Sequence, residues 1–427
     1  MDTTRRSDVR LRVANRSQMH MNMECLDELL PPDHQARVIW AAIERLDLSA
    51  FYEAIKAHPD SGGRDASDPQ ILISLWLYAA TEGVGSAREL DRLCGTDAAY
   101  RWICGGVSLN YHTISDFRTD HREGLDDLFS QTIALLVDKQ LIQVRRISQD
   151  GLRVRANVGV KSYRREERLG KLMEEARRHL EEIGKQSEDP QVSARQAAAR
   201  QRAARERVQR VQEAMDRMPE LKRRQEKREK NDPKRRGKVV RASTTDASVD
   251  VIRMPDGGLR PGVNVQVGTA MEGRAIVGVM VSSSGSDAGL AEPMRRQVEE
   301  RMGQSPQEQF IDGGYVSEET VERAAEQGVT LFMPPRPAQN PEKLGDEYQP
   351  RADDSPAIAE WRRRMGTAEA QAAYLQRAST SETVNADLRC WRGLGWLTIR
   401  GIGKITCLAL WSALAYNLLH FGKALIG

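Results

Sequence analysis

Three acidic residues stand where carboxylates could support metal-dependent chemistry. Asp150 and Asp312 each end a short run of residues typical of a β-strand, and Glu382 lies on a later helical segment. Carboxylates that are far apart in sequence can converge at strand ends, where they could hold two divalent cations that clamp the attacking and leaving oxygens of a phosphoryl transfer. Oxygen ligands favour Mg²⁺ or Mn²⁺, and no set of His and Cys residues indicates a zinc site.

Each of these carboxylates also has a structural interpretation. An aspartate often ends a strand because its side chain favours the following turn. The segment 379–382 reads Ser-Thr-Ser-Glu and matches a capping box, so Glu382 could simply cap its own helix. Asp246 and Asp287 are further polar residues near strand ends that could support a site. Position by itself leaves the structural and the metal-binding interpretations open.

The elements that must position these residues follow from the apolar pattern. Strands are expected at 147–150, 249–254, 263–267, 275–281, 309–312 and 329–333. Helices are expected at 289–302, 318–327, 357–389 and 406–425. Strands gathered in the middle of the chain, with helices between them, indicate a mixed α/β sheet flanked by helices.

The N-terminal part of the chain has a helical pattern. Residues 26–140 are expected to form a helical domain after a loose tail at 1–25. Asp68 is well placed to cap a helix that begins at Pro69. The segment 113–116, Thr-Ile-Ser-Asp, resembles a capping box that would begin another helix. Compact helices joined by short turns could include a helix-turn-helix.

The formal net charge of +3 conceals a strong asymmetry along the chain. Residues 161–241 contain 26 Lys and Arg against 15 Asp and Glu, a surplus of 11, so the remainder sums to about −8. The segment is rich in helix formers and predicts two charged helices joined near 187–190, in an antiparallel hairpin. Its charge favours a polyanion partner, whereas a solvated arm without a DNA role is the alternative.

Other features narrow the class of protein. The five cysteines include no CxxC pair and fit a reducing cytoplasm. The longest apolar run, 405–419, is shorter than a bilayer span and contains polar residues, so no membrane partner is expected. Three tryptophans could stack on bases, but on apolar helices they are interpreted as core residues: Trp391, Trp396 and Trp411.

Taken in order, the motifs resemble those of bacterial insertion-sequence transposases of the DDE class, from about Leu30 to His420. The residues 150–153, Asp-Gly-Leu-Arg, look like the family's D-G-T-[KR], and 312–315, Asp-Gly-Gly-Tyr, look like its D-x-G-Y. Each tetrapeptide is weak, whereas the ordered set is specific. The following residues look like the family's Y-R-E-K helix: Tyr374, Arg377, Glu382 and Arg389.

The resemblance implies a ribonuclease-H-like catalytic domain at 141–400, interrupted by the helical insertion 161–238 and followed by a C-terminal helix at 401–427. It implies cutting and joining of double-stranded DNA, with terminal inverted repeats and target DNA as partners, and it makes residues 26–140 the N-terminal DNA-binding domain. A homodimer on DNA and a location in the bacterial cytoplasm, at the nucleoid, are expected. A metal-dependent nuclease on the same fold and a catalytically inactive DNA-binding relative remain alternatives.

The resemblance also assigns roles to residues. Asp150, Asp312 and Glu382 would be the catalytic carboxylates and would hold two Mg²⁺ or Mn²⁺ ions per active site. The DNA contacts expected from the motifs and from the basic segment are Tyr374, Arg377, Arg389, Arg153, Lys234, Arg235 and Arg236.

The third motif departs from the family in two respects. Arg389 stands where the family has Lys, which keeps the charge and adds a planar fork suited to phosphate. Four residues separate Arg377 from Glu382, where the family usually has three. Five steps along a continuous α-helix place two side chains about 140° apart. Either Tyr374 and Arg377 precede a helix that Ser379 caps, or their assigned roles are wrong.

Overall fold

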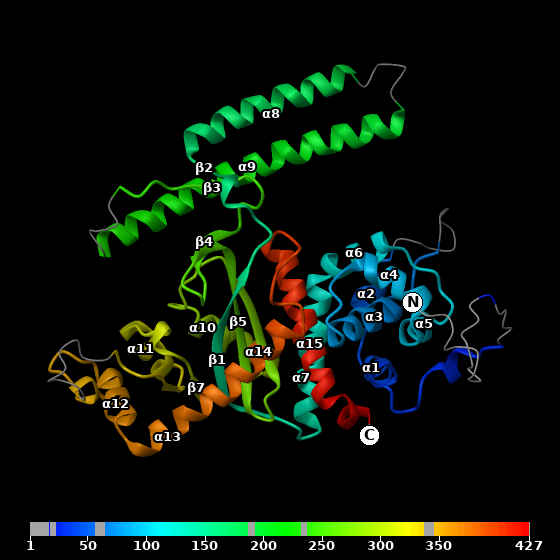
Figure 1. The fold of residues 1–427 in the computed structure, drawn as a ribbon. Coiled ribbons are helices and arrows are strands. Elements are labelled where there is room, and N and C mark those ends of the chain that lie inside the picture. The colour runs from blue at the N-terminus through cyan, green and yellow to red at the C-terminus, as the bar shows by residue number, and fades with distance from the viewer. Residues whose placement is uncertain are drawn as a thin grey trace, which may run out of the picture.

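The computed structural model describes residues 17, 23–55, 65–186, 193–231, 237–336 and 346–426. Their helices surround a mixed six-stranded sheet, which confirms the expected α/β class (Figure 1). A pair of long helices extends from the sheet, and a bundle of shorter helices lies beside it (Figure 1).

The N-terminal helices form that bundle. Asp68 accepts a hydrogen bond from the Gln70 N–H at 2.9 Å, which confirms the predicted helix start at Pro69. The capping box predicted at 113–116 is wrong, because Asn110, three residues before Thr113, caps a helix that begins at Tyr111. The helices are α1 (Gln35–Ile43), α2 (Ser49–Glu53), α3 (Pro69–Thr81), α4 (Ala87–Thr96), α5 (Ala98–Cys104), α6 (Tyr111–Asp120) and α7 (Arg122–Asp138).

The central strand of the sheet is β1 (Gln143–Arg155). It pairs antiparallel with β5 on one side and parallel with β7 on the other, and β7 pairs parallel with β8. The long strand β5 also pairs with β4 near its start and with β6 further along. The other strands are β4 (Asp250–Arg253), β5 (Leu259–Glu272), β6 (Ile276–Ser282), β7 (Glu308–Phe310) and β8 (Thr330–Phe332).

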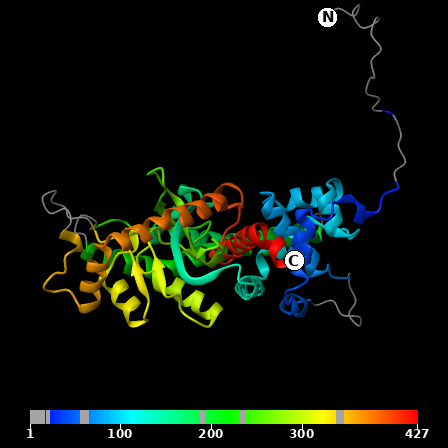
Figure 2. The same ribbon diagram turned by 90° about the horizontal axis from the view of Figure 1, so that it is seen from below.

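Helices cover both faces of this sheet (Figure 2). One face carries α10 (Ala291–Met302) and α11 (Glu318–Glu326). The third-motif helices run across the other face, preceded by α12 (Pro356–Met365). These are α13 (Ala368–Arg377), a π-helical segment (Ala378–Glu382) and α14 (Thr383–Cys390).

The last helix, α15 (Ile402–Ile426), lies at the centre of the protein. It packs against α7, β6, α3 and α1, so it joins the helical bundle to the sheet in one apolar core. Its length and composition would allow it to span a membrane, but 72% of its most apolar window is buried inside the fold. Its apolar surface is therefore used in the core. Trp411, on this helix, is buried as predicted and donates its Nε1–H to the Arg118 carbonyl at 3.0 Å.

The charged segment forms a helical hairpin, α8 (Glu166–Gln186) and α9 (Ala194–Asn231), as predicted (Figure 1). A small apolar cluster that includes Leu169, Ala214 and Met218 holds the two helices together at their base. The base is joined to the sheet by the short strands β2 (Tyr163–Arg164) and β3 (Ala242–Ser243), which pair with each other. We call α8 and α9 the arm.

Candidate active site

The register of two parallel strands brings Asp150 and Asp312 together. Ser148 on β1 lies opposite Phe310 on β7, which is the last paired position of that ladder. Asp150 and Asp312 each follow two residues later, so they emerge side by side just beyond the pairing, where neighbouring strands are about 4.8 Å apart. The prediction that Asp150 ends its strand is wrong, because β1 continues to Arg155 through its pairing with β5.

Asp150 has partners from three directions. Its Oδ1 accepts a hydrogen bond from the Gly151 N–H at 2.8 Å, and its Oδ2 accepts one from Asn385 Nδ2 at 3.2 Å. Arg377 Nη1 lies 3.7 Å from the same Oδ2. Burial raises the pKa of Asp150; the Asp312 and Asp287 carboxylates add to the rise, and Arg377 opposes it. Bringing cations to this position would relieve the repulsion among the carboxylates.

Asp312 begins a short turn. Its Oδ1 accepts the Gly314 N–H at 2.7 Å and caps a 3-10 helix at Gly313–Tyr315. A Cβ atom on Gly314 would lie 2.8 Å from Asp312 Oδ1 and 3.4 Å from Asp287 Oδ2. Glycine is therefore the residue that lets this turn approach the two carboxylates.

Asp287, on the loop between β6 and α10, is a third carboxylate at this place. It is only 9% exposed, and its Oδ1 accepts hydrogen bonds from Asn264 Nδ2 at 2.7 Å and Gln266 Nε2 at 2.9 Å. Arg153 Nη2 lies 3.6 Å from its Oδ2. The sequence predicts the same supporting role for Asp287 and Asp246, but Asp246 instead accepts a hydrogen bond from the Gly401 N–H ahead of α15. The loop that carries Asp287 has no motif that would single it out.

A network of buried side-chain amides on β1, β5 and β7 lies next to these carboxylates. Gln266 Oε1 accepts hydrogen bonds from Gln149 Nε2, at 2.7 Å, and from the Tyr315 hydroxyl. Gln309 Nε2 donates to Gln149 Oε1 at 2.8 Å, and Arg295 donates to Gln309 at 2.6 Å. Each member is tied to a neighbour from another element, so the network fixes the spacing of β1, β5 and β7.

The π-helical segment explains the irregular spacing of the third motif. Helix α13 leads directly into the segment Ala378–Glu382, and α14 continues from it. A π-helical turn has i→i+5 hydrogen bonds and absorbs one extra residue in an otherwise α-helical run. Arg377 and Glu382 are thereby brought closer to one face than the 140° of a regular helix. The capping role considered for Ser379 and Glu382 is wrong, since Ser379 lies inside the run and donates to the Gln376 carbonyl.

Two residues of this motif point at the aspartates. The Arg377 guanidinium lies over the Tyr374 ring, 5.8 Å from its centroid. Burial alone would lower the pKa of Arg377, but Tyr374, Asp150 and Asp312 reverse the effect and raise it. Burial likewise raises the pKa of Tyr374. The pair therefore presents a fixed positive charge beside Asp150.

Glu382 and Arg389 lie further out. Both side chains are exposed, and neither makes a hydrogen bond or ion pair with another residue of the described chain. The inward positions on this helix are taken by Ser381, which hydrogen-bonds Ser148, and by Asn385. Across the described ranges, no three His, Cys, Asp or Glu side chains are grouped closely enough to hold a metal ion.

The atoms beside Asp150 and Gly151 that could bind a cation are carboxylate and amide oxygens. Asn264 Oδ1 and Asn385 Oδ1 are buried and accept no hydrogen bond. A Cβ atom on Gly151 would lie 2.6 Å from Asn264 Oδ1 and 2.6 Å from Asp287 Oδ1, so both oxygens face the backbone beside Asp150. Carboxylate and amide oxygens are the ligands that Mg²⁺ and Mn²⁺ prefer. These oxygens suit a hard divalent cation in kind, although the carboxylates of the described residues are not grouped closely enough here to hold one.

Of the remaining residues predicted to contact DNA, one lies at the candidate active site and three lie in a segment that the structure does not describe. Arg153 lies at the site through its ion pair with Asp287. Lys234, Arg235 and Arg236 lie outside the described residues.

The interpretation of Trp391 and Trp396 as core residues is wrong. Their side chains are 65% and 62% exposed, because both follow α14 in an irregular segment that faces outward. The nearby Arg155 guanidinium lies 4.9 Å from the Trp396 ring centroid.

Comparison with known protein families gives two matches. Residues 24–120 match the family described as Transposase domain (DUF772), and this region contains α1 to α6 of the helical bundle. Residues 241–418 match the family described as Transposase DDE domain, which includes Asp287, Asp312 and Glu382. Asp150 and the arm lie between the two matched regions. Neither the curated proteins nor the solved structures include a match to this chain.

Proposed function

Because the chain belongs to the insertion-sequence transposases of the DDE class, we propose that it cleaves DNA at the ends of its own element and joins those ends to target DNA. The observation that carries this proposal is the parallel register of β1 and β7, which sets Asp150 beside Asp312 at the end of a short ladder. Two buried amide oxygens near them, Asn264 Oδ1 and Asn385 Oδ1, have no hydrogen-bond partner among the described residues and could bind a cation.

In this proposal Asp150, Asp312 and Glu382 would hold two Mg²⁺ or Mn²⁺ ions, which requires the exposed Glu382 side chain to turn inward. When bound, the ions would supply Lewis acidity that activates water and stabilises charge on the phosphate oxygens. Arg377 and Arg389 bind phosphates next to the cut, and Tyr374 positions the flanking strand. Asp287 is a positioning residue that orients the side chains of Asn264 and Gln266 next to Gly151.

Both chemical steps exchange one bond at phosphorus for another. Water attacks the phosphate at the transposon end, the bond to the 3′ oxygen breaks, and a 3′ hydroxyl is released. That hydroxyl then attacks a target phosphodiester, so a new ester bond forms as a target ester bond breaks. The number of ester bonds is unchanged in the second step, which therefore needs no external energy source. The N-terminal helices recognise the terminal repeats, and a homodimer pairs two ends.

The test uses Asp312→Asn, with Asp353→Asn as a matched control at an exposed position. We expect Asp312→Asn to lose Mg²⁺-dependent cleavage of an end-containing duplex while it still binds that duplex. Wild type and the control should cleave and should give joined products with a supercoiled target. Undiminished cleavage by Asp312→Asn would refute the site, and cleavage by wild type without joined products would favour a nuclease.

A further inference from the structure

The base of the arm contains a pocket in which arginine is the main lining residue. Its polar lining consists of five arginines and two threonines, with no carboxylate, around a cavity of about 410 Å³. The arginines come from four elements of the chain, so they converge only in the folded protein. They are Arg164 on β2, Arg168 on α8, Arg207 and Arg210 on α9, and Arg400 before α15.

Most of this charge is not neutralised. Arg168 pairs with Glu175 at 3.0 Å, whereas Arg164, Arg207, Arg210 and Arg400 make no ion pair with any residue of the described chain. Arg400 is instead held by its Nε–H, which donates to the Asn157 carbonyl at 3.0 Å. Like charges placed together without a counter-charge cost stability, and a bound polyanion would remove that cost.

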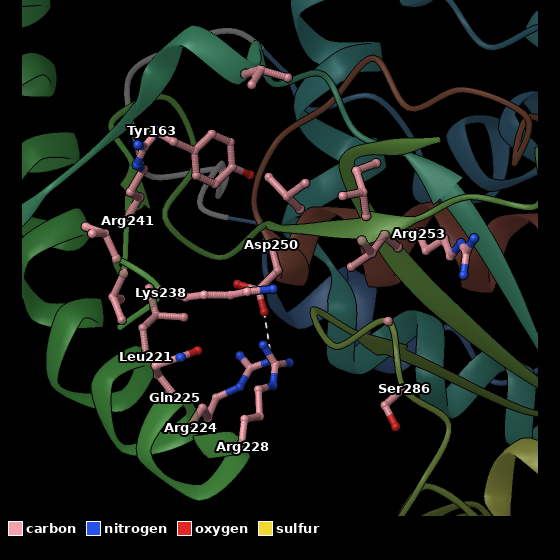
Figure 3. A pocket seen from close by; sticks show the side chains of 17 residues that line it. Tyr163, Leu221, Arg224, Gln225, Arg228, Lys238, Arg241, Asp250, Arg253 and Ser286 are labelled. Carbon is pink, nitrogen blue, oxygen red and sulfur yellow. Dashed lines mark ion pairs between the residues drawn. The ribbon is translucent and has the colours of Figure 1, made fainter. Parts of the chain in front are cut away.

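A second basic groove near the arm is of a different kind (Figure 3). It lies between the end of α9 and β4, and it contains Asp250, whose Oδ2 lies 2.8 Å from Arg224 Nη2. Arg217 Nη2 also lies 4.0 Å from Asp250. These ion pairs attach the arm to the sheet, and exposed Val239 and Leu259 line the same groove. We interpret this groove as a structural junction.

The arginine pocket lies along a path that starts at the candidate active site. Arg153 contacts Asp287, and Arg155, two residues further, points from the same side of β1. The backbone of Arg155 pairs with Trp396, and its guanidinium stacks on that exposed ring. Asn157 follows and holds Arg400. From Asp150 to Arg155, β1 advances by five residues and about 17 Å, which is the length of roughly five base pairs.

We propose that this path, from Arg153 over Arg155 and Trp396 to the arginine pocket, binds the sugar-phosphate backbone of the DNA duplex that leads away from the cleaved phosphate. The proposal rests on the proposed function. Arginine suits this task because its planar donors pair with phosphate oxygens and its face stacks on an aromatic ring. Trp396 offers a surface against which the sugar or a frayed base can pack.

The experiment measures binding of a fluorescein-labelled duplex to the full-length protein in EDTA, across a series of salt concentrations. The variant Arg207→Gln/Arg210→Gln removes two charges from the pocket. The matched control Arg228→Gln/Arg241→Gln removes two charges from the groove in Figure 3. Each lost phosphate contact lowers the slope of log K against log salt by about 0.9.

We expect the pocket variant to lower this slope by about 1.8 and the control to leave it unchanged. In a hydroxyl-radical footprint, Arg400→Gln should also remove backbone protection beyond about five base pairs from the cleaved phosphate. Equal slopes for wild type and the pocket variant would overturn the proposal, and so would an equal loss in both variants. Because no metal is present, these results do not depend on cleavage. A wild type that binds as expected but never cleaves would refute only the proposed function.

Discussion

Gly151 lies directly against Asp287, a residue 136 positions later in the chain: a Cβ atom on Gly151 would lie 2.6 Å from Asp287 Oδ1. The same atom would lie 2.6 Å from Asn264 Oδ1 and 2.7 Å from Gln266 Nε2. The glycine after the first aspartate is thus required by the packing of polar side chains from the neighbouring strand and loop. The contact links the backbone of β1 to the β6–α10 loop.

Gly151→Ala should therefore disturb the site more than the addition of a single methyl group would suggest. We expect it to cost about 1–3 kcal/mol in the free energy of unfolding, because the surrounding amides cannot move without breaking hydrogen bonds. Mg²⁺-dependent end cleavage should be lost. Gly159→Ala is the control, since a Cβ there would meet nothing within 4 Å. Urea unfolding and cleavage assays on both variants give the comparison, and equal behaviour would contradict the prediction.

Asp287→Asn should weaken cation binding in the absence of DNA. Asparagine can keep an oxygen toward Asn264 and Gln266, so the fold should persist while one negative charge is lost. We expect Mn²⁺ affinity, measured by electron paramagnetic resonance titration, to fall about tenfold, as for other residues that orient ligands. Asp353→Asn, an exposed change, should leave the affinity unchanged. Unaltered Mn²⁺ affinity in Asp287→Asn would exclude the positioning role.

His121 should make the stability of the helical bundle depend on pH. Burial against Phe117 and Phe51, whose ring centroids lie 4.6 and 5.5 Å away, lowers the pKa of His121, and Asp120 opposes this in part. The unfolded chain therefore binds the proton more readily, and this contribution to stability is lost as the pH falls below about 6.5. His121→Gln should lose less stability than wild type between about pH 7.5 and pH 5.5 in urea unfolding. Equal losses would show that His121 does not contribute.

Leu169→Ala should open the arm before the rest of the protein unfolds. Leu169 is fully buried in a cluster separate from the main core, so its truncation should cost about 2–3 kcal/mol locally. Limited proteolysis should then cut residues 161–241 faster, while the main unfolding transition in urea stays in place. Leu375→Ala, at a side chain that is 73% exposed, is the control. Arm proteolysis at the wild-type rate would contradict the prediction.

Features that depend on neighbours in sequence were predictable. The start of α3 follows from Asp68 and Pro69, and the two helices of the arm follow from a long run of helix formers. The order of the motifs at Asp150, Asp312 and Glu382 also lies in the sequence, and it led to the correct family. Each of these rests on local backbone preference or on residue order, which the chain carries before it folds.

Features that depend on register and packing were decided by the tertiary structure. Whether Asp150 ends its strand depends on β5, which extends the pairing to Arg155, and on β7, which stops at Phe310. The π-helical segment before Glu382, the approach of Asp287 to Gly151 and the convergence of arginines at the arm arise between elements distant in sequence. The apolar pattern along the sequence cannot predict these contacts, because hydrogen-bond register and side-chain packing are set only when the elements pack together.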